Sequence, residues 1–161
     1  MPRKLSTQEQ ERFLAGRHVA VLVTLAPGGE PVPTPIWYLY RDGRFYFRTG
    51  AEAIKTRNAR RDPRVSICIQ DERPPYRAIV VRGTAEVSEG SLGLAEEMPQ
   101  RYLGFLGALG YRRGVRQQVE QGEEVTIIVT PTKITSLDYT PETPLVGRLW
   151  FLLKRFLPPW L

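Results

Sequence analysis

Hydrophobic residues recur at every second position in the first third of the chain, which is the period of a β-strand. The segment VAVLVTL, residues 19–25, shows this alternation most clearly. Two glycine-containing turns follow, at residues 27–30 and 42–43, and glycine supplies the positive φ that tight hairpins require. The pattern predicts three successive strands between residues 18 and 47, joined as an antiparallel meander.

Three later segments have the same β character. Residues 64–70 (RVSICIQ) and 76–87 (YRAIVVRGTAEV) predict two further strands, and residues 124–131 (EVTIIVTP) predict the last strand of the core. Six antiparallel strands with few helices are typical of a closed barrel, because closure removes unpaired strand edges. We therefore expect a mainly β protein, a β-barrel with flanking helices.

Segments with a longer period predict those helices. Ser6 followed by Glu9 gives a capping-box pattern at the start of residues 6–15. A second helix is expected over residues 51–61, ending at an Asp-Pro pair, because the residue before proline is pushed out of the α region. The third, residues 92–120, should be helical but broken, with interruptions at Pro99, Gly104, Gly107, Gly110 and Gly114.

Composition is that of an ordinary globular domain. The 161 residues are 42% hydrophobic and 25% charged, enough for one domain with a substantial core. We assign residues 1–144 to this domain and residues 145–161 to an apolar tail. No segment reaches about 18 apolar residues and the first residues hold no apolar run, so neither a spanning helix nor a signal peptide is expected.

Cysteine and histidine are nearly absent, which limits the chemistry. Cys68 alone excludes an intrachain disulfide framework and fits a reducing, cytoplasmic location, and its alternation with hydrophobic residues predicts a buried, inert thiol. His18 alone excludes a multi-histidine metal site, so we expect no metal. A surface or capping role for His18 is favoured over haem ligation.

Positive charge is concentrated in one window. The chain has a net charge of +6 and a pI near 9.8, which favours an anionic partner. Six cations and two acids lie between positions 48 and 64, so this window carries most of the excess charge. The cations are Arg48, Lys55, Arg57, Arg60, Arg61 and Arg64.

This window begins where a strand should end and a helix should start. The first turn of a helix leaves backbone N–H groups unpaired and carries a partial positive charge, so it binds phosphate readily. Thr49 adds a hydroxyl donor, and Arg48 and Lys55 could converge on the same anion. The alternative is a solvated basic helix face, which fits Arg60 and Arg61 best, near the negative end of the helix dipole.

Several motifs together resemble a known family. The stretch GGEPVPTPIWYLYRDGRFYFRTGAEAIKTRNARRDPRVSICIQ, followed by YRAIVVRGTAEV, resembles the pyridoxamine 5′-phosphate oxidase-like, flavin-binding split-barrel superfamily. The chain looks most like its flavin- and deazaflavin-binding branch. AIKTRNARRDPRVS is the most specific element, and weaker resemblance recurs at residues 100–104 and 125–139.

The resemblance implies a fold and a site. It implies a six-stranded antiparallel split barrel and a two-fold homodimer with the cofactor at the subunit interface. The cofactor phosphate would lie at the end of the third strand and the following helix, and the ring along the second strand. Many relatives have serine where this chain has Ala53, so one phosphate-directed hydroxyl is missing. The implied cofactor-binding residues are Thr34, Pro35, Ile36, Trp37, Arg48, Thr49, Ala53, Ile54, Lys55, Arg57 and Tyr76.

The cofactor and reaction follow from the same resemblance. Coenzyme F-420, a deazaflavin with a phosphodiester and a polyglutamate tail, would need a longer cationic groove extended by Arg57, Arg60 and Arg61. Flavin mononucleotide (FMN) carries one phosphate and is the alternative, with haem or no cofactor behind both. The expected activity is hydride transfer between the reduced ring and a small organic substrate. No catalytic acid or base can be selected, although Tyr38 and Tyr76 are candidates to face substrate or to pack in the core or rim.

Other functions remain open at this point. A flavin or deazaflavin carrier would use the same phosphate site without a substrate pocket. A nucleic-acid binder is disfavoured, because the chain opens with three strands rather than the βαββαβ order of an RNA-recognition sheet. The tail, GRLWFLLKRFLPPWL, is expected to dock on its own subunit or on the dimer partner, with an interfacial membrane anchor as the alternative.

Overall fold

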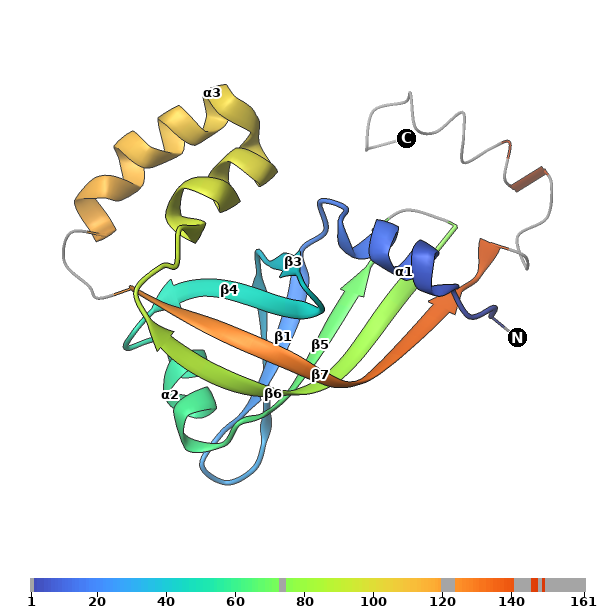
Figure 1. Ribbon diagram of the computed structural model, residues 1–161, viewed down its shortest axis with the longest axis horizontal. Helices are drawn as coiled ribbons and strands as arrows, with labels where there is room; N and C mark the ends of the chain where they lie inside the picture. Colours follow the sequence, from blue (N-terminus) through green and yellow to red (C-terminus); the bar gives the residue numbers. More distant parts are fainter. Residues whose placement is uncertain (1, 73–74, 120–123, 141–145, 148, 150–161) are drawn as a thin grey trace.

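The computed structural model describes residues 2–72, 75–119, 124–140, 146, 147 and 149, with side chains excepted over 112–119. The predicted tail, residues 145–161, lies almost entirely outside the described residues. A single antiparallel sheet carries helices at its ends and on one side (Figure 1). The elements are α1 (Thr7–Leu14), β1 (Ala20–Leu25), β2 (Pro31–Ile36), β3 (Leu39–Arg41), β4 (Arg44–Gly50), α2 (Ile54–Arg61), β5 (Arg64–Gln70), β6 (Arg77–Glu89), α3 (Leu94–Val119) and β7 (Glu124–Asp138).

The mainly β, split-barrel fold is confirmed, with two corrections to its topology. The described sheet has seven strands rather than six, in the order β2-β1-β5-β6-β7-β4-β3, and it is not a closed barrel. The predicted meander is wrong, because β2 and β3 are consecutive in sequence but form opposite edges of the sheet. Between them the Tyr38 N–H donates to the Tyr102 hydroxyl (3.1 Å), so the chain leaves one edge and joins the other.

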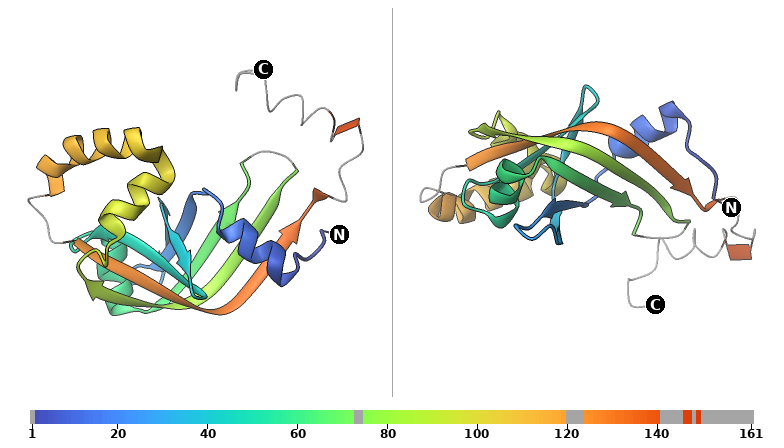
Figure 2. Two further views of the ribbon diagram at one scale, coloured as in Figure 1. Left: turned by 45° about the horizontal axis from the view of Figure 1, so that its top comes forward. Right: turned by 90° about the horizontal axis from the view of Figure 1, so that it is seen from below.

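The two longest strands form the backbone of the sheet. β6 and β7 pair over their whole lengths, with a register shift after Arg82 that places Gly83 opposite Pro131. A β-bulge bends a strand and increases its twist, and it also tolerates proline. For this reason β7 continues to Asp138, well beyond the strand end predicted at residue 131. The strongly curved pair is visible in Figure 2.

The core fills the concave side of this curved sheet. Alternate residues of the central strands point inward, and α1 closes one end with Phe13 and Leu14. At the other end α2 contributes Ala59 and contacts β1 and β6. The largest fully buried side chains include Tyr38, Phe45, Phe47, Leu22, Ile67, Ile69, Ile79 and Ile127.

Helices α1 and α3 match their predicted positions to within two residues at each end. The capping box is confirmed: Ser6 accepts from the Glu9 N–H (3.3 Å), and Glu9 accepts from the Ser6 N–H (2.8 Å). Helix α3 is broken as predicted, at Gly104, whose φ of 71° divides it into two limbs. Among the described residues, no helix combines the length and apolarity needed to span a membrane.

The free edge of β2 cannot donate hydrogen bonds. Pro31, Pro33 and Pro35 stand opposite Leu25, Val23 and Val21 of β1, and they alternate along β2 with three residues that have an N–H. Because proline has no N–H, these three must occupy the positions whose backbone groups point away from β1. The edge therefore presents carbonyl acceptors only, which prevents addition of another strand in the usual ladder.

Gly83 is required by the close approach of β6 and β7. A Cβ built there would lie 2.6 Å from the Thr130 carbonyl oxygen and 2.8 Å from Val129 Cγ1. We predict that Gly83→Ala lowers the free energy of unfolding by about 1–3 kcal/mol, the range for overpacking. Gly110→Ala is the control, because it has no neighbour within 4 Å and lies in a helix. Urea unfolding that shows equal stability for both variants would contradict this account.

Candidate functional site

The junction between β4 and α2 is held by backbone contacts. The Gly50 carbonyl at the end of β4 accepts from the Ala53 N–H (3.1 Å) and from the Thr56 hydroxyl (2.8 Å). These bonds turn the chain sharply, so that α2 begins at Ile54, three residues later than predicted. Its first turn consequently lies directly beside the last residues of β4.

Lys55 and Thr49, two of the predicted cofactor-binding residues, meet at this junction. Lys55 Nζ donates to Thr49 Oγ1 (3.3 Å), and both side chains are half-buried. Burial lowers the pKa of Lys55 below its ordinary value. The N-cap of α2 is Ala53, which makes no side-chain capping bond, and the first turn holds no acid. The uncapped helix start and the partly desolvated ammonium together form a small electropositive site.

Arg48 does not join this pair in the structure. Adjacent residues of a strand face opposite sides, and the Arg48 guanidinium binds Glu124 through Nε (2.9 Å to Oε2) and a second, shorter contact. The Glu124 carboxylate raises the pKa of Arg48, and the hydroxyl of Tyr111 adds to the effect. Arg48 would have to leave Glu124 before it could bind another anion.

Most other cations of the basic window are also engaged. Arg60 pairs with Glu89 (3.1 Å), and Arg64 pairs with Asp62 (2.6 Å). Arg61 donates to Asn58 Oδ1 (3.3 Å) and to the Leu25 carbonyl. Arg57 is exposed, and no ion pair involves it among the described residues. In the described part of this window, Lys55, Arg57 and Arg61 have no carboxylate partner, and Arg61 already donates to two neutral oxygens, so Lys55 and Arg57 are the cations best placed to meet an anion.

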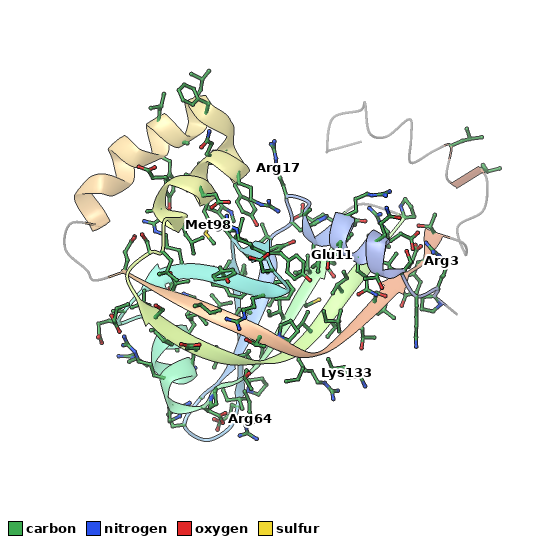
Figure 3. The ribbon with its side chains drawn as sticks, in the orientation of Figure 1. Arg3, Glu11, Arg17, Arg64, Met98 and Lys133 are labelled. Carbon is green, nitrogen blue, oxygen red and sulfur yellow. The ribbon has the colours of Figure 1, made fainter. Side chains whose placement is uncertain are left out.

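An aromatic cluster lies beneath α3, at the corner between β2 and β3. The Trp37 and Tyr102 rings stack in parallel, with centroids 4.8 Å apart, and Tyr111 tilts against Trp37 at 5.7 Å. Since Tyr111 also interacts with Arg48, it links this cluster to the Arg48–Glu124 pair. Met98, labelled in Figure 3, packs between the first limb of α3 and the sheet.

Tyr102 anchors this corner through its hydroxyl. It accepts from the Tyr38 N–H (3.1 Å) and donates to the His18 carbonyl (2.8 Å). Its neighbour Arg101 donates to the carbonyls of Ala15 and Gly16 at the end of α1. The first limb of α3 thereby ties α1 to the strand edges. Sequence reasoning missed Tyr102, Tyr111 and Glu124; the only signal was the weak resemblance at residues 100–104.

The β2 residues predicted to lie along a ring divide between two faces. Thr34 and Ile36 pair with Leu22 and Ala20, so they are half-buried on the core side. Pro35 is exposed on the outer side, and Trp37 turns away into the aromatic cluster. Ile54 is exposed at the start of α2.

Tyr76 lies far from Lys55 within one chain. It precedes β6, at the end of the sheet opposite α2, and a seven-residue strand between these ends spans roughly 20 Å. Tyr76 borders a shallow hollow of about 370 Å³ with Cys68, Val80, Leu137 and others. Tyr38, the other tyrosine considered for substrate contact, is fully buried and donates to the Leu14 carbonyl (3.0 Å), so it is a core residue.

His18 and Cys68 have structural surroundings. His18 stacks on Phe13 with centroids 4.3 Å apart, and burial lowers its pKa although Asp71 lies 3.7 Å away. Cys68 is half-buried on the outer face of β5, where burial raises the pKa of the thiol. No group of three or more potential metal ligands occurs in the described part of the chain.

Comparison with known proteins identifies the family to which this chain belongs. The profile of the pyridoxamine 5′-phosphate oxidase family matches residues 6–138 of this chain. The chain therefore belongs to that family, whose flavin-binding split-barrel superfamily the motifs and the fold also indicate. None of the curated proteins compared with the chain matches it.

Solved structures with the same fold include one from Mycobacterium tuberculosis. The conserved hypothetical protein Rv2991 is 27% identical, with 87% of this chain and 89% of that one covered and a TM-score of 0.71. A protein described as an F420 reductase is 25% identical, with 77% and 94% covered and a TM-score of 0.60. A FAD-binding protein from Mesorhizobium loti shares the fold at 20% identity, with 84% and 96% covered and a TM-score of 0.59.

The Tyr102 hydroxyl should contribute substantially to stability. We predict that Tyr102→Phe lowers the free energy of unfolding by about 1–3 kcal/mol, because the buried Tyr38 N–H and His18 carbonyl lose their partner. Tyr40→Phe is the matched control, since its hydroxyl bonds only the exposed Glu11 carboxylate (3.1 Å). Chemical unfolding should separate the two; a loss for Tyr102→Phe no larger than for Tyr40→Phe would contradict the anchoring role.

Proposed function

We propose that this protein binds a phosphorylated flavin-type ring, FMN or coenzyme F-420, and transfers hydride between that ring and a small organic substrate. The observation that carries the proposal is the half-buried Lys55–Thr49 pair at the uncapped start of α2, in a chain of this family. The alternative is a carrier that binds the same cofactor without turnover.

The residues at the β4–α2 junction fit a phosphate. Lys55 offers a charged donor, Thr49 a hydroxyl, and the first turn of α2 offers unpaired N–H groups together with the positive end of its dipole. Burial lowers the pKa of Lys55, and among the described residues its ammonium meets the Thr49 hydroxyl and no carboxylate, so a bound anion would stabilise the charged form. Ala53 contributes no hydroxyl here, so Lys55 is expected to provide a large part of the affinity.

The ring is proposed to lie along β2. Its free edge offers carbonyl acceptors at Pro31, Pro33 and Pro35, which suit the ring N–H of either cofactor. The cofactor supplies hydride chemistry, while the chain holds the ring, excludes water and shapes the substrate pocket. Trp37, Tyr102 and Tyr111 would provide an aromatic wall for that pocket.

A homodimer is part of the proposal. The outer face of β1, β5 and β6 carries partly exposed apolar side chains, among them Val21, Cys68 and Val80. Two adjoining hollows of about 390 and 370 Å³ lie on this face, and the second includes Tyr76. A second copy covering the face would bury it and would bring Tyr76 of one subunit towards the partner's cofactor, since Tyr76 is distant from Lys55 within one chain.

Similarity to an F420 reductase favours the deazaflavin over FMN. The cations of the chain support this preference less than the sequence suggested. Arg60 is paired with Glu89 and Arg61 donates to the Leu25 carbonyl, so among the described members of this group Arg57 remains to meet a longer anionic tail. FMN needs only the Lys55–Thr49 site. The absorbance spectrum of the purified protein after addition of each cofactor distinguishes them.

Loss of the Lys55 ammonium should weaken cofactor binding. We predict that Lys55→Ala lowers the affinity for FMN or F-420 by about 1.5–3 kcal/mol, the range for a hydrogen bond to a charged group. Arg64→Ala should leave it unchanged, since Arg64 is paired with Asp62 beyond the end of α2. Fluorescence titration measures both; equal affinities for Lys55→Ala and the native protein would count against the phosphate site.

Binding should also depend on pH above neutrality. Because burial lowers the pKa of Lys55 and phosphate favours its charged form, binding is strongest when the lysine is protonated. Affinity should therefore fall as the pH rises through the lowered pKa of the free protein towards the higher pKa of the complex. Lys55→Arg, which stays charged, should flatten this dependence in titrations from pH 7 upward. A profile identical in both proteins would assign the dependence to another group.

A further inference from the structure

The second limb of α3, residues 105–119 and here called the distal limb, projects away from the sheet. It follows the break at Gly104, and it lies clear of the strands in Figure 1 and in the left view of Figure 2. Three of its apolar side chains face solvent: Phe105 is 65% exposed, Leu106 80% and Leu109 39%. Such neighbouring exposed apolar side chains are a mark of an interaction surface.

This exposure belongs to one side of the limb. Ala108 is fully buried and Tyr111 is half-buried against Trp37, so these two define the side towards the barrel. Residues 105, 106 and 109 fall on the opposite part of the helical circumference, at 100° per residue. Among the described residues, no other segment buries the side chains of 105, 106 and 109 as fully as Ala108 is buried.

The charge of the distal limb restricts what could cover this side. Its sequence holds Arg112, Arg113 and Arg116, and no Asp or Glu occurs between Met98 and Val119. The surface that covers the limb should therefore offer both an apolar medium and negative charge.

Two occupants from this protein fit poorly. The tail, residues 145–161, is also apolar and carries Arg148, Lys154 and Arg155 without an acid. A tail docked on the limb would bring two segments of net charge +3 together, and the same repulsion opposes pairing of two distal limbs. Each of these pairings would bury apolar side chains but would also bring like charges close together.

We propose that the distal limb docks on an anionic lipid bilayer. At 100° per residue, positions 112, 113 and 116 fall on the same side of the limb as 105, 106 and 109, one to three turns further along. On a bilayer, the apolar side chains that follow Gly104 would enter the interface, and the arginines of the later turns would lie near the anionic headgroups. The limb is fixed to the barrel through Tyr102 and Arg101, just before Gly104. This inference is independent of cofactor binding, because no residue of the Lys55–Thr49 site takes part.

Vesicle co-sedimentation of the full chain tests the proposal. The vesicles are phosphatidylcholine alone or phosphatidylcholine with about 30% phosphatidylglycerol, in low and high salt. The test variant is Phe105→Ser/Leu106→Ser. The control is Leu92→Asn, which removes another apolar side chain that is 53% exposed, and asparagine tolerates the positive φ of 47° found there. Circular dichroism and thermal unfolding confirm that the variants remain folded.

We expect binding to the anionic vesicles that is at least about tenfold stronger than binding to neutral vesicles and that weakens with salt. The Phe105→Ser/Leu106→Ser variant should lose about tenfold or more of this partitioning, because two apolar side chains leave the interface, whereas Leu92→Asn should keep it. Three outcomes overturn the proposal. They are no binding, binding unaffected by the double variant, and a self-association in solution that the double variant abolishes.

Discussion

The pairing of β6 with β7 is the constraint on which the rest of the structure depends. These strands form the middle of the sheet, and the bulge at Gly83 lets them bend together while Thr130 approaches within 2.6 Å of where a side chain would begin. Their curvature wraps the sheet around a core closed by α1 and α2. Pairing of β4 with β7 then fixes where β4 ends, and so where α2 starts. Any side chain at position 83 would disturb all of these positions together.

The two chemically distinctive regions of the molecule lie on opposite faces of β4. Thr49 faces Lys55 at the start of α2, whereas its neighbour Arg48 faces Glu124 and the aromatic cluster under α3. The alternation of the strand thus places Arg48, which is paired with Glu124, on one face of β4, while the next residue, Thr49, contacts the unpaired Lys55 on the other face. This is why a window of six cations reduces to a small site around Lys55, with Arg57 nearby. An electropositive helix start alone would fit many anions, so the proposal of a cofactor phosphate at this site depends on the family assignment.

Local patterns predicted much of the molecule, and long-range pairing accounts for what they missed. The Ser6 capping box, the break in α3 at a glycine and the Thr49–Lys55 contact all follow from residues close in sequence. The separation of β2 from β3 could not be predicted in this way, since it depends on Tyr102, 64 residues from Tyr38, accepting a backbone hydrogen bond. The partner of Arg48 is likewise 76 residues away, so its charge looked free in the sequence. Residues 100–104 carried a weak family signal, but nothing local indicated that Tyr102 would stack on Trp37.

A crystal structure after soaking with FMN and, separately, with coenzyme F-420 tests the central claim most directly. The account predicts that the phosphate of the bound cofactor lies within hydrogen-bond distance of Lys55 Nζ and Thr49 Oγ1, at the start of α2. A cofactor whose phosphate is bound elsewhere on the chain, with Lys55 still donating to Thr49, would contradict it.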